Sequence, residues 1–309
     1  MSSAANAAPR GAPRGMAARM ARRFMQHRLA LASLILLILL ALLALAAPLV
    51  EYALGVDANE ANLFTRFAPP STEHPLGTDE LGRDLLVRLL YGGRVSLAVG
   101  LSAAAFAAVI GTSLGLLAGY FGGRLDAFVM RFTDGVIALP LLPLLIVLAA
   151  IDLAKIGIPA ELAQSEDVSL YRIVVIVALF GWTTVARLVR AEALRIRSRE
   201  FVTAARSMGA GHWRIMAVHI LPNAVSPIIV ATTLSMGNII LFESVLSFLG
   251  LGIQPPVASW GNMLTNAQEL IWNAPALAIW PGLAIFVTVI AFNFLGDGLQ
   301  DALDPRAVE

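Results

Sequence analysis

The 309-residue chain contains no cysteine, which excludes disulfide bonds and cysteine-based metal or redox sites. Charged residues are also scarce, at 14% of the chain, whereas soluble domains contain about 25%. Hydrophobic residues make up 58%, and the mean hydropathy is +0.77. A soluble fold of this size would need more polar surface, so the composition predicts an integral membrane protein.

Lysine is nearly absent as well, because Lys155 is the only one and all other basic residues are arginines. The phosphate-binding motif G-x-x-x-x-G-K-[ST] does not occur, so this chain cannot supply the lysine of a P-loop ATPase. We therefore expect no catalytic residue, no cofactor and no metal ligand in this chain. If ATP drives its function, ATP and Mg²⁺ bind to a partner protein.

Six apolar runs come close to the ~20 residues that a membrane-spanning helix needs. They predict an all-α protein with six transmembrane helices, at about residues 29–50, 95–119, 130–151, 172–189, 223–250 and 276–296. The first run resembles a signal peptide because Ala44-Leu45-Ala46 mimics a cleavage site. It is longer than the about 7–15 apolar residues of a signal peptide, so we expect an uncleaved anchor. Residues 1–28, with six arginines and no acid, predict a disordered basic tail.

The distribution of basic residues predicts the orientation of these helices. Six spans place both termini on one side of the membrane, together with 16 of the 22 basic residues. The other side holds only Arg66, Arg83, Arg88, Arg94, Lys155 and Arg172. The positive-inside rule therefore places both termini and the loop 190–222 in the cytoplasm. Seven arginines lie between positions 187 and 214, and burying them in lipid would cost about 20 kcal/mol at ~3 kcal/mol each.

The stretch TAARSMGAGHWRIMAVHILP, residues 203–222, is the polar break that this topology assigns to the cytoplasm. Its pattern predicts a short helix over 200–208 and a second one over about 212–220, separated by Gly209 and Gly211. Pro222 is expected to open the next span. One face of the first helix would carry Phe201, Ala204, Ala205 and Met208. Small residues there would let another protein approach closely; a plain loop lying on lipid headgroups is the alternative.

The stretch HPLGTDELGRDLLVRLLYGGR, residues 74–94, predicts an amphipathic helix at the outer interface. Thr78 would be its N-cap, acids would fill its first turn, and Gly92-Gly93 would end it. The predicted apolar stripe consists of Leu81, Leu85, Leu86, Leu89 and Leu90. The residues expected to face away are Arg83, Asp84 and Arg88.

Small residues four apart favour close helix packing, and Gly111, Gly115 and Gly119 have this spacing inside the second span. The same letters contain G-x-S-x-G around Ser113, the nucleophile pattern of many hydrolases. That pattern needs a strand-turn-helix context and a nearby base, and all four histidines lie outside the predicted spans. We therefore interpret the three glycines as helix-packing residues.

Two carboxylates fall inside predicted spans, and such residues are candidates for function. Asp134 would lie near the cytoplasmic end of its helix, where Arg131 or Arg124 could pair with it. Glu243 is expected near the outer surface, where water or a structural hydrogen bond would satisfy it. Neither residue is predicted at the middle of the membrane, which weakens the hypothesis of a proton relay.

The spacing of Ala204-Ala205, Gly209 and Leu221-Pro222 resembles the EAA loop of ABC importer permeases. The resemblance implies that this loop contains a coupling helix that docks on an ATPase subunit. Thr203 stands where the family has its leading glutamate, so any salt bridge made by that glutamate is absent. The residues implied in docking are Glu200, Thr203, Ala204, Ala205, Ser207, Gly209, Leu221 and Pro222.

Residues 74–94, 246–264 and 281–306 are similar to the C-type permease subunits of dipeptide and oligopeptide ABC importers, and the whole resemblance covers about residues 20–306. It implies a type I importer permease with a five-helix core at 94–298, including the coupling loop 190–222. Residues 1–28 would be a cytoplasmic tail. Residues 29–93 would hold the first span, an extracytoplasmic loop and the amphipathic helix, and 299–309 a second cytoplasmic tail.

The resemblance also implies partners. It predicts a heterodimer with a homologous permease, two cytoplasmic ABC ATPase subunits and an extracytoplasmic substrate-binding protein, embedded in the lipid of a bacterial or archaeal cytoplasmic membrane. Peptides are the expected substrate; nickel and glutathione are alternatives with the same architecture. An ion-driven secondary transporter is the alternative class, disfavoured because the chain shows no convincing internal repeat. No nucleic acid partner is expected.

Overall fold

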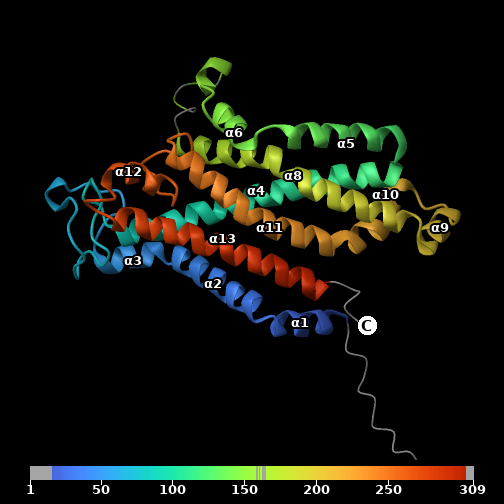
Figure 1. Ribbon diagram of the computed structural model, residues 1–309, viewed down its shortest axis with the longest axis horizontal. Helices are drawn as coiled ribbons and strands as arrows, with labels where there is room; N and C mark the ends of the chain where they lie inside the picture. Colours follow the sequence, from blue (N-terminus) through green and yellow to red (C-terminus); the bar gives the residue numbers. More distant parts are fainter. Residues whose placement is uncertain (1–15, 158, 160, 162–164, 304–309) are drawn as a thin grey trace, which may run out of the picture.

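The structure is a computed structural model that describes residues 16–157, 159, 161 and 165–303 (Figure 1). Its long helices run side by side in one bundle. Five of them are long and apolar enough to cross a membrane, and a bent pair makes six if it is counted as one broken span. These are α2 (Arg28–Leu45), α4 (Leu85–Phe121), α8 (Glu166–Arg197), α11 (Leu221–Phe248), α13 (Ala276–Leu303) and the pair α5 (Gly123–Ala138) with α6 (Leu141–Ala149). The predicted all-α architecture with six spans is confirmed.

The third predicted span is not one straight helix. Helices α5 and α6 are bent by 84° at a short break. The break lies at Leu139, whose backbone is extended, directly before Pro140. Proline disfavours the helical conformation of the residue before it and removes one backbone donor. The apolar run 130–151 therefore predicted the position of this crossing but not its shape.

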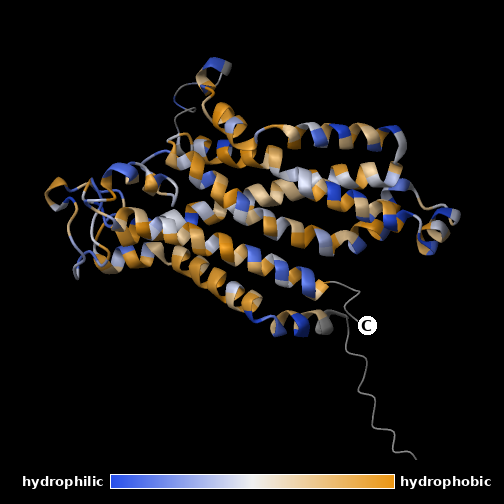
Figure 2. Ribbon diagram, viewed as in Figure 1, coloured by the Kyte–Doolittle hydropathy of each residue, from blue (hydrophilic) through white to orange (hydrophobic). Residues whose placement is uncertain are grey.

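The short elements gather at the two ends of the bundle (Figure 1). One end, the α9 end, carries α1 (Met16–Gln26), α9 (Glu200–Ser207) and α10 (His212–Arg214). The opposite end, the α12 end, carries α3 (Ala47–Leu54), η1 (Leu63–Thr65), η4 (Asn262–Leu264) and α12 (Ala267–Leu270). Figure 2 shows hydrophobic residues along the long helices and more hydrophilic ones toward both ends. The described chain begins and finishes at the α9 end.

Helix α1 corrects the expectation of a disordered tail over residues 1–28. Residues 16–26 form a helix that contacts the end of α13, and residues 1–15 lie outside the described chain. His27 lies between α1 and α2 and is the N-cap of α2, because its Nδ1 accepts a hydrogen bond from the Ala30 amide at 3.1 Å. Its Nε2 lies 3.6 Å from Asp301 of α13. These contacts fix the start of the first span against the last one.

The amphipathic helix predicted over residues 78–91 is wrong in its boundaries and its faces. Helix α4 starts at Leu85, with Asp84 as its N-cap, and continues through Gly92-Gly93 to Phe121 without a break. Thr78 pairs with Asp84 in an isolated bridge instead of capping a helix. Asp84 and Arg88, predicted to face away, are buried. A domain boundary at 93/94 would cut this helix.

Helices α4 and α8 form the tightest seam of the bundle, and the three predicted packing glycines lie in it. A Cβ on Gly111 would come within 2.6 Å of the Trp182 carbonyl oxygen. A Cβ on Gly115 would come within 2.6 Å of the Ala186 carbonyl oxygen, and one on Gly119 within 2.6 Å of the Ala193 Cβ. Only glycine allows the two backbones to approach so closely.

Helix α8 is much longer than its predicted span 172–189. Ser165 caps its start, since the hydroxyl accepts a hydrogen bond from the Val168 amide at 3.4 Å. The helix then extends beyond the apolar stretch to Arg197 at the α9 end. The short helix η2 (Leu153–Ile156) precedes α8 in the chain, and α9 follows it.

Candidate functional site

The loop between α8 and α11 has the helix-turn-helix form that its sequence predicts. Helix α9 covers Glu200–Ser207, and Gly209 turns the chain with a φ of +84°, which side-chain-bearing residues rarely adopt. Gly211 is the N-cap of α10. An added Cβ at Gly209 would meet nothing within 4 Å, so backbone conformation rather than space requires glycine at this position.

The sequence predicted that the second short helix of this loop is separate from the next span. In the structure the two are continuous. Helix α10, the π-helical turn η3 (Ile215–Ile220) and α11 form one continuous helix over His212–Phe248. Pro222 lacks the N–H that an α-helix would donate to the Val218 carbonyl. The wider π turn η3 lies shortly before Pro222. Such π turns are frequently found at functional sites. A movement of α10 is therefore transmitted directly to α11.

The loop from α9 to α10 presents an apolar surface that no part of the described chain covers. Val202 and Ala205 point inward and are buried, so Ala205 does not belong to the exposed face predicted for it. Phe201, Met208 and Trp213 are 47%, 82% and 75% exposed. Three large apolar side chains this exposed at a polar end of the molecule indicate a contact site for another protein.

Most of the residues predicted to dock are exposed on this loop. Glu200, Thr203, Ala204 and Ser207 are exposed, Pro222 is exposed, and Leu221 is half-buried. The Thr203 hydroxyl donates to the Arg199 carbonyl at 3.4 Å, within its own helix. Glu200 lies one turn before Thr203, so it is the acid of α9 that remains free to face outward.

An aromatic cluster that sequence reasoning missed ties this loop to the end of α4. The Tyr120 hydroxyl lies 2.8 Å from the Nδ1 of His212, the first residue of α10. The Arg206 guanidinium lies 5.9 Å from the centre of the Tyr120 ring, a cation–π distance. Arg197 of α8 donates to the Tyr120 carbonyl at 3.2 Å. No motif marks Tyr120, because its partners Arg197, Arg206 and His212 lie more than 70 residues away from it in sequence.

At the α12 end, Glu243 lies near the predicted end of its helix, and structural hydrogen bonds rather than water satisfy it. Its side chain is fully buried where α11 packs against α4. The Ser96 hydroxyl donates to it at 3.1 Å and the Ser247 hydroxyl at 2.8 Å. Helix length placed Glu243 at the correct end of the bundle, but the loop 251–262 folds back over it and excludes solvent.

The two serines also hold this covering loop. The Ser96 hydroxyl accepts a hydrogen bond from the Trp260 amide at 3.2 Å, and the Ser247 hydroxyl accepts one from the Ile253 amide at 3.1 Å. The Trp260 indole donates to the Leu89 carbonyl at 3.0 Å. Glu243 thus fixes the direction of two hydroxyls, and their free lone pairs fix the backbone of the loop. We call Glu243, Ser96, Ser247 and Trp260 the Glu243 network.

Asp134 also differs from its predicted pairing. Its carboxylate lies 2.5 Å from the Arg187 guanidinium of α8, rather than beside Arg131 or Arg124. A second pair joins Asp126 of α5 and Arg190 of α8. These pairs link α5 to α8, so Arg187 and Arg190 are each paired with an acid of the neighbouring helix.

The fold defines an all-helical, multi-pass integral membrane protein, and the α8–α11 loop gives it an exposed apolar surface at one end. A family model described as the binding-protein-dependent transport system inner membrane component matches residues 111–309. A second, described as the N-terminal transmembrane domain of oligopeptide transport permease C, matches residues 15–70. The chain therefore belongs to the family of inner membrane components of binding-protein-dependent transport systems, the permeases of ABC transporters.

Curated relatives match nearly the whole chain. A dipeptide transport system permease protein of Alkalihalophilus pseudofirmus is 40% identical over 286 residues, covering 92% of this chain and 88% of the relative. A glutathione transport system permease protein of Pectobacterium atrosepticum is 42% identical, covering 92% and 89%. A putative peptide permease protein of Brucella suis is 41% identical over 291 residues, covering 94% and 91%.

Proposed function

We propose that this chain is one of two membrane subunits of an ATP-driven importer of dipeptides or oligopeptides. Family membership and the peptide permeases among its relatives support this function. Glutathione, itself a tripeptide, is the substrate named for another relative and remains within the same chemical class. The chain would have no catalytic activity, since it lacks a P-loop lysine, and ATP and Mg²⁺ would bind to two ATPase subunits.

The observation that carries the proposal is the exposed apolar surface of the α9 loop. In the proposed assembly, Phe201, Met208 and Trp213 contact an ATPase subunit, and the predicted docking residues Glu200, Thr203, Ala204 and Ser207 border that contact. Ala205, Gly209 and Pro222 would shape the loop rather than touch the partner. Glu200 would provide the acid that Thr203 no longer supplies.

Force would then pass from the loop to the membrane along two routes. Because α10 and α11 form one helix, a displacement of Trp213 tilts the whole of α11. Through the Tyr120–His212 contact, the same displacement also moves the end of α4. Closure of the two ATPase subunits would thereby rock α4 and α11 as rigid bodies and alternate access to the substrate. A second permease and an extracytoplasmic binding protein complete the proposed assembly.

In this proposal the α9 end and both termini face the cytoplasm of a bacterial or archaeal cell. The absence of cysteine offers a direct test. Ser207 and Thr72 are both exposed, at opposite ends of the molecule. In intact spheroplasts a membrane-impermeant thiol reagent should label Thr72→Cys and spare Ser207→Cys. The reverse labelling would contradict the orientation.

Docking is tested by changing Met208 to Asp in the full complex. Met208 is exposed, so a carboxylate there costs the isolated chain little, but it would place an unpaired charge in a buried contact. We expect the ATPase subunits to co-purify poorly and ATP-dependent peptide uptake to fall by about tenfold or more, equivalent to about 1.4 kcal/mol. Phe64→Asp is the matched control, because Phe64 is fully exposed at the other end.

Three outcomes separate the proposal from its alternatives. If Met208→Asp leaves ATPase association and uptake unchanged, the α9 loop is not the docking site. If the unmodified complex accumulates peptide without ATP but with an ion gradient, the chain belongs to an ion-driven transporter. Uptake of Ni²⁺ without uptake of peptide would contradict the substrate class.

A further inference from the structure

One face of α11 borders two hollows that together extend along most of the helix. Its residues are three, four or seven positions apart, a spacing that places them on one side of an α-helix. We call this face the α11 wall; it includes Asn223, Val230, Leu234, Asn238, Leu241 and Val245. The first four line a groove toward the α9 end, and the last two line a pocket toward the α12 end.

The groove toward the α9 end has a volume of about 630 Å³ and lies between α8, α11 and α13. Hydroxyl and amide side chains from all three helices line it, namely Thr184, Asn223, Ser226, Ser235, Asn238 and Gln300. Its two charged residues, Glu192 and Arg195, pair with each other. The groove therefore offers many neutral hydrogen-bonding groups and no net charge.

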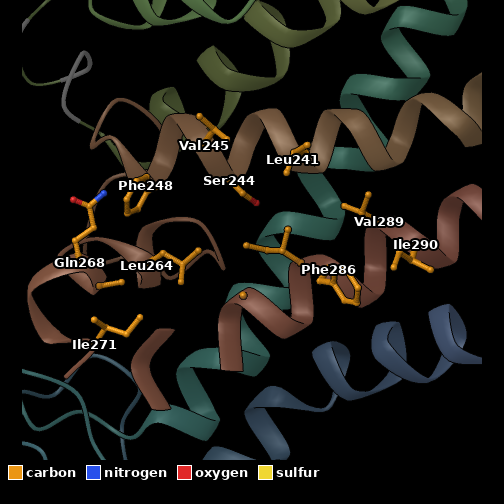
Figure 3. A pocket seen from close by; sticks show the side chains of 13 residues that line it. Leu241, Ser244, Val245, Phe248, Leu264, Gln268, Ile271, Phe286, Val289 and Ile290 are labelled. Atoms are coloured by element: carbon orange, nitrogen blue, oxygen red, sulfur yellow. The ribbon is translucent and has the colours of Figure 1, made fainter. Parts of the chain in front are cut away.

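The pocket toward the α12 end has a volume of about 600 Å³ and a different lining. Figure 3 shows Leu241 and Phe248 of α11 and Phe286 of α13 around it, with Leu264 and Ile271 of the adjoining loop on another side. Ser244 and Gln268 are the only polar side chains among those that line it. The wall thus changes from polar to apolar between Asn238 and Leu241.

Asn238 shows that this wall does not face lipid. It lies near the middle of the predicted span 223–250, and its side chain is exposed. It makes no hydrogen bond to any other group in the described part of the chain. Polar side chains at membrane depth face the bundle interior, a neighbouring helix or a water-filled cavity, because hydrocarbon offers no hydrogen-bond partner. A hollow with six neutral polar groups fits the water-filled cavity best.

We propose that the α11 wall lines the passage of the imported substrate. Its neutral amides and hydroxyls match the N–H and C=O groups of a peptide backbone, and its apolar pocket matches hydrophobic side chains. Small peptides are therefore the substrate class that fits both the polar groove and the apolar pocket of the wall. This inference rests on the proposed function and adds the residues that contact the substrate.

Single cysteines in the full complex, reconstituted in proteoliposomes, test this placement. Asn238→Cys should react with a bulky, water-soluble methanethiosulfonate reagent. The attached group should lower ATP-driven uptake of the tripeptide Ala-Phe-Ala about tenfold, a change equivalent to about 1.4 kcal/mol. Reductant should restore uptake. Ile229→Cys is the control, because Ile229 is also exposed on α11 but lies on the opposite side of the helix from the wall.

Each outcome bears on the proposal. No reaction at Asn238→Cys in the assembled complex would mean that the second permease covers the wall, and reaction without loss of uptake would mean that substrate passes elsewhere. Either result overturns the inference while the unmodified complex still imports peptide. A failure of that unmodified complex to import peptide with ATP would instead contradict the proposed function.

A second pair of variants tests the chemistry without any label. Asn238→Leu removes the neutral hydrogen-bonding group at a similar side-chain size and should reduce tripeptide uptake severalfold. Asn238→Gln keeps the amide and should restore most of it. A purely structural role would instead lower the amount of assembled complex, which gel filtration measures. Equal uptake by the Leu and Gln variants at equal assembly would overturn the stated chemistry.

Discussion

The loops at the two ends of the bundle differ in how far the chain itself buries them. At the α12 end, residues 251–262 cover Glu243, and Trp260 and Ser259 are buried. At the α9 end, Met208 and Trp213 remain largely exposed. The loop at the α12 end is covered within the described chain, while the loop at the α9 end presents the apolar surface that we propose an ATPase subunit covers.

This difference predicts that substitutions at one end change the stability of the fold, while substitutions at the other end change assembly and transport. A buried polar group must have its hydrogen bonds, so changes at the Glu243 network should act on folding. Exposed apolar side chains contribute little to the folded state of one chain, so changes on the α9 loop should act on assembly and transport. Variants at the two ends should therefore fall into different classes of phenotype.

The largest effect is expected from Glu243→Leu. The change leaves the Ser96 and Ser247 hydroxyls without their acceptor in a buried site, and each unsatisfied group costs about 1–3 kcal/mol. The unfolding temperature of the purified protein in detergent should fall sharply, and protease should cleave the loop 251–262. Glu243→Gln keeps an acceptor oxygen and should be milder. A Leu variant as stable as the parent would show that this loop does not depend on the network.

Gly252→Ala should have the next largest effect, also on stability. A Cβ at Gly252 would lie 2.2 Å from the Ser247 hydroxyl and 2.6 Å from the Ser247 Cα, so the loop must move. Overpacking of this kind costs about 1–3 kcal/mol. Gly250→Ala is the matched control: it has open space but a φ of +72°, which costs an L-residue roughly 1–2 kcal/mol. Thermal unfolding ranks the two; a larger loss for Gly250→Ala would contradict the packing argument.

The sequence was sufficient wherever one local pattern decides the structure. Runs of apolar residues located all six crossings, and the Gly209 turn followed from the glycine between two helical patterns. The spacing of Gly111, Gly115 and Gly119 indicated a helix seam. Each of these features depends on neighbours within a few turns of the same segment, so the pattern contains the information.

The errors and the open alternatives arose where distant segments meet. The choice between water and a structural hydrogen bond for Glu243 stayed open because nothing in its own helix shows that residues 251–262 return to cover it. Asp134 looked closest to arginines of its own segment, whereas tertiary packing brought Arg187 of α8 to it. Thr78 and Asp84 are equally good caps by composition, and the bridge between them decides which one starts α4. Tyr120 had no signal because its partners lie in three other segments.

The smallest effect is expected from Tyr120→Phe, which tests the connection between the α9 loop and α4. The change removes the hydroxyl that lies 2.8 Å from His212 and keeps the aromatic ring beneath Arg206. One hydrogen bond contributes about 0.5–1.5 kcal/mol, so stability should change little. We expect peptide uptake per ATP hydrolysed to fall a few-fold, because α4 no longer follows α10. Tyr171→Phe, on an exposed tyrosine of α8, is the control. Unchanged coupling in Tyr120→Phe would mean that the continuous helix from His212 to Phe248 transmits the movement alone.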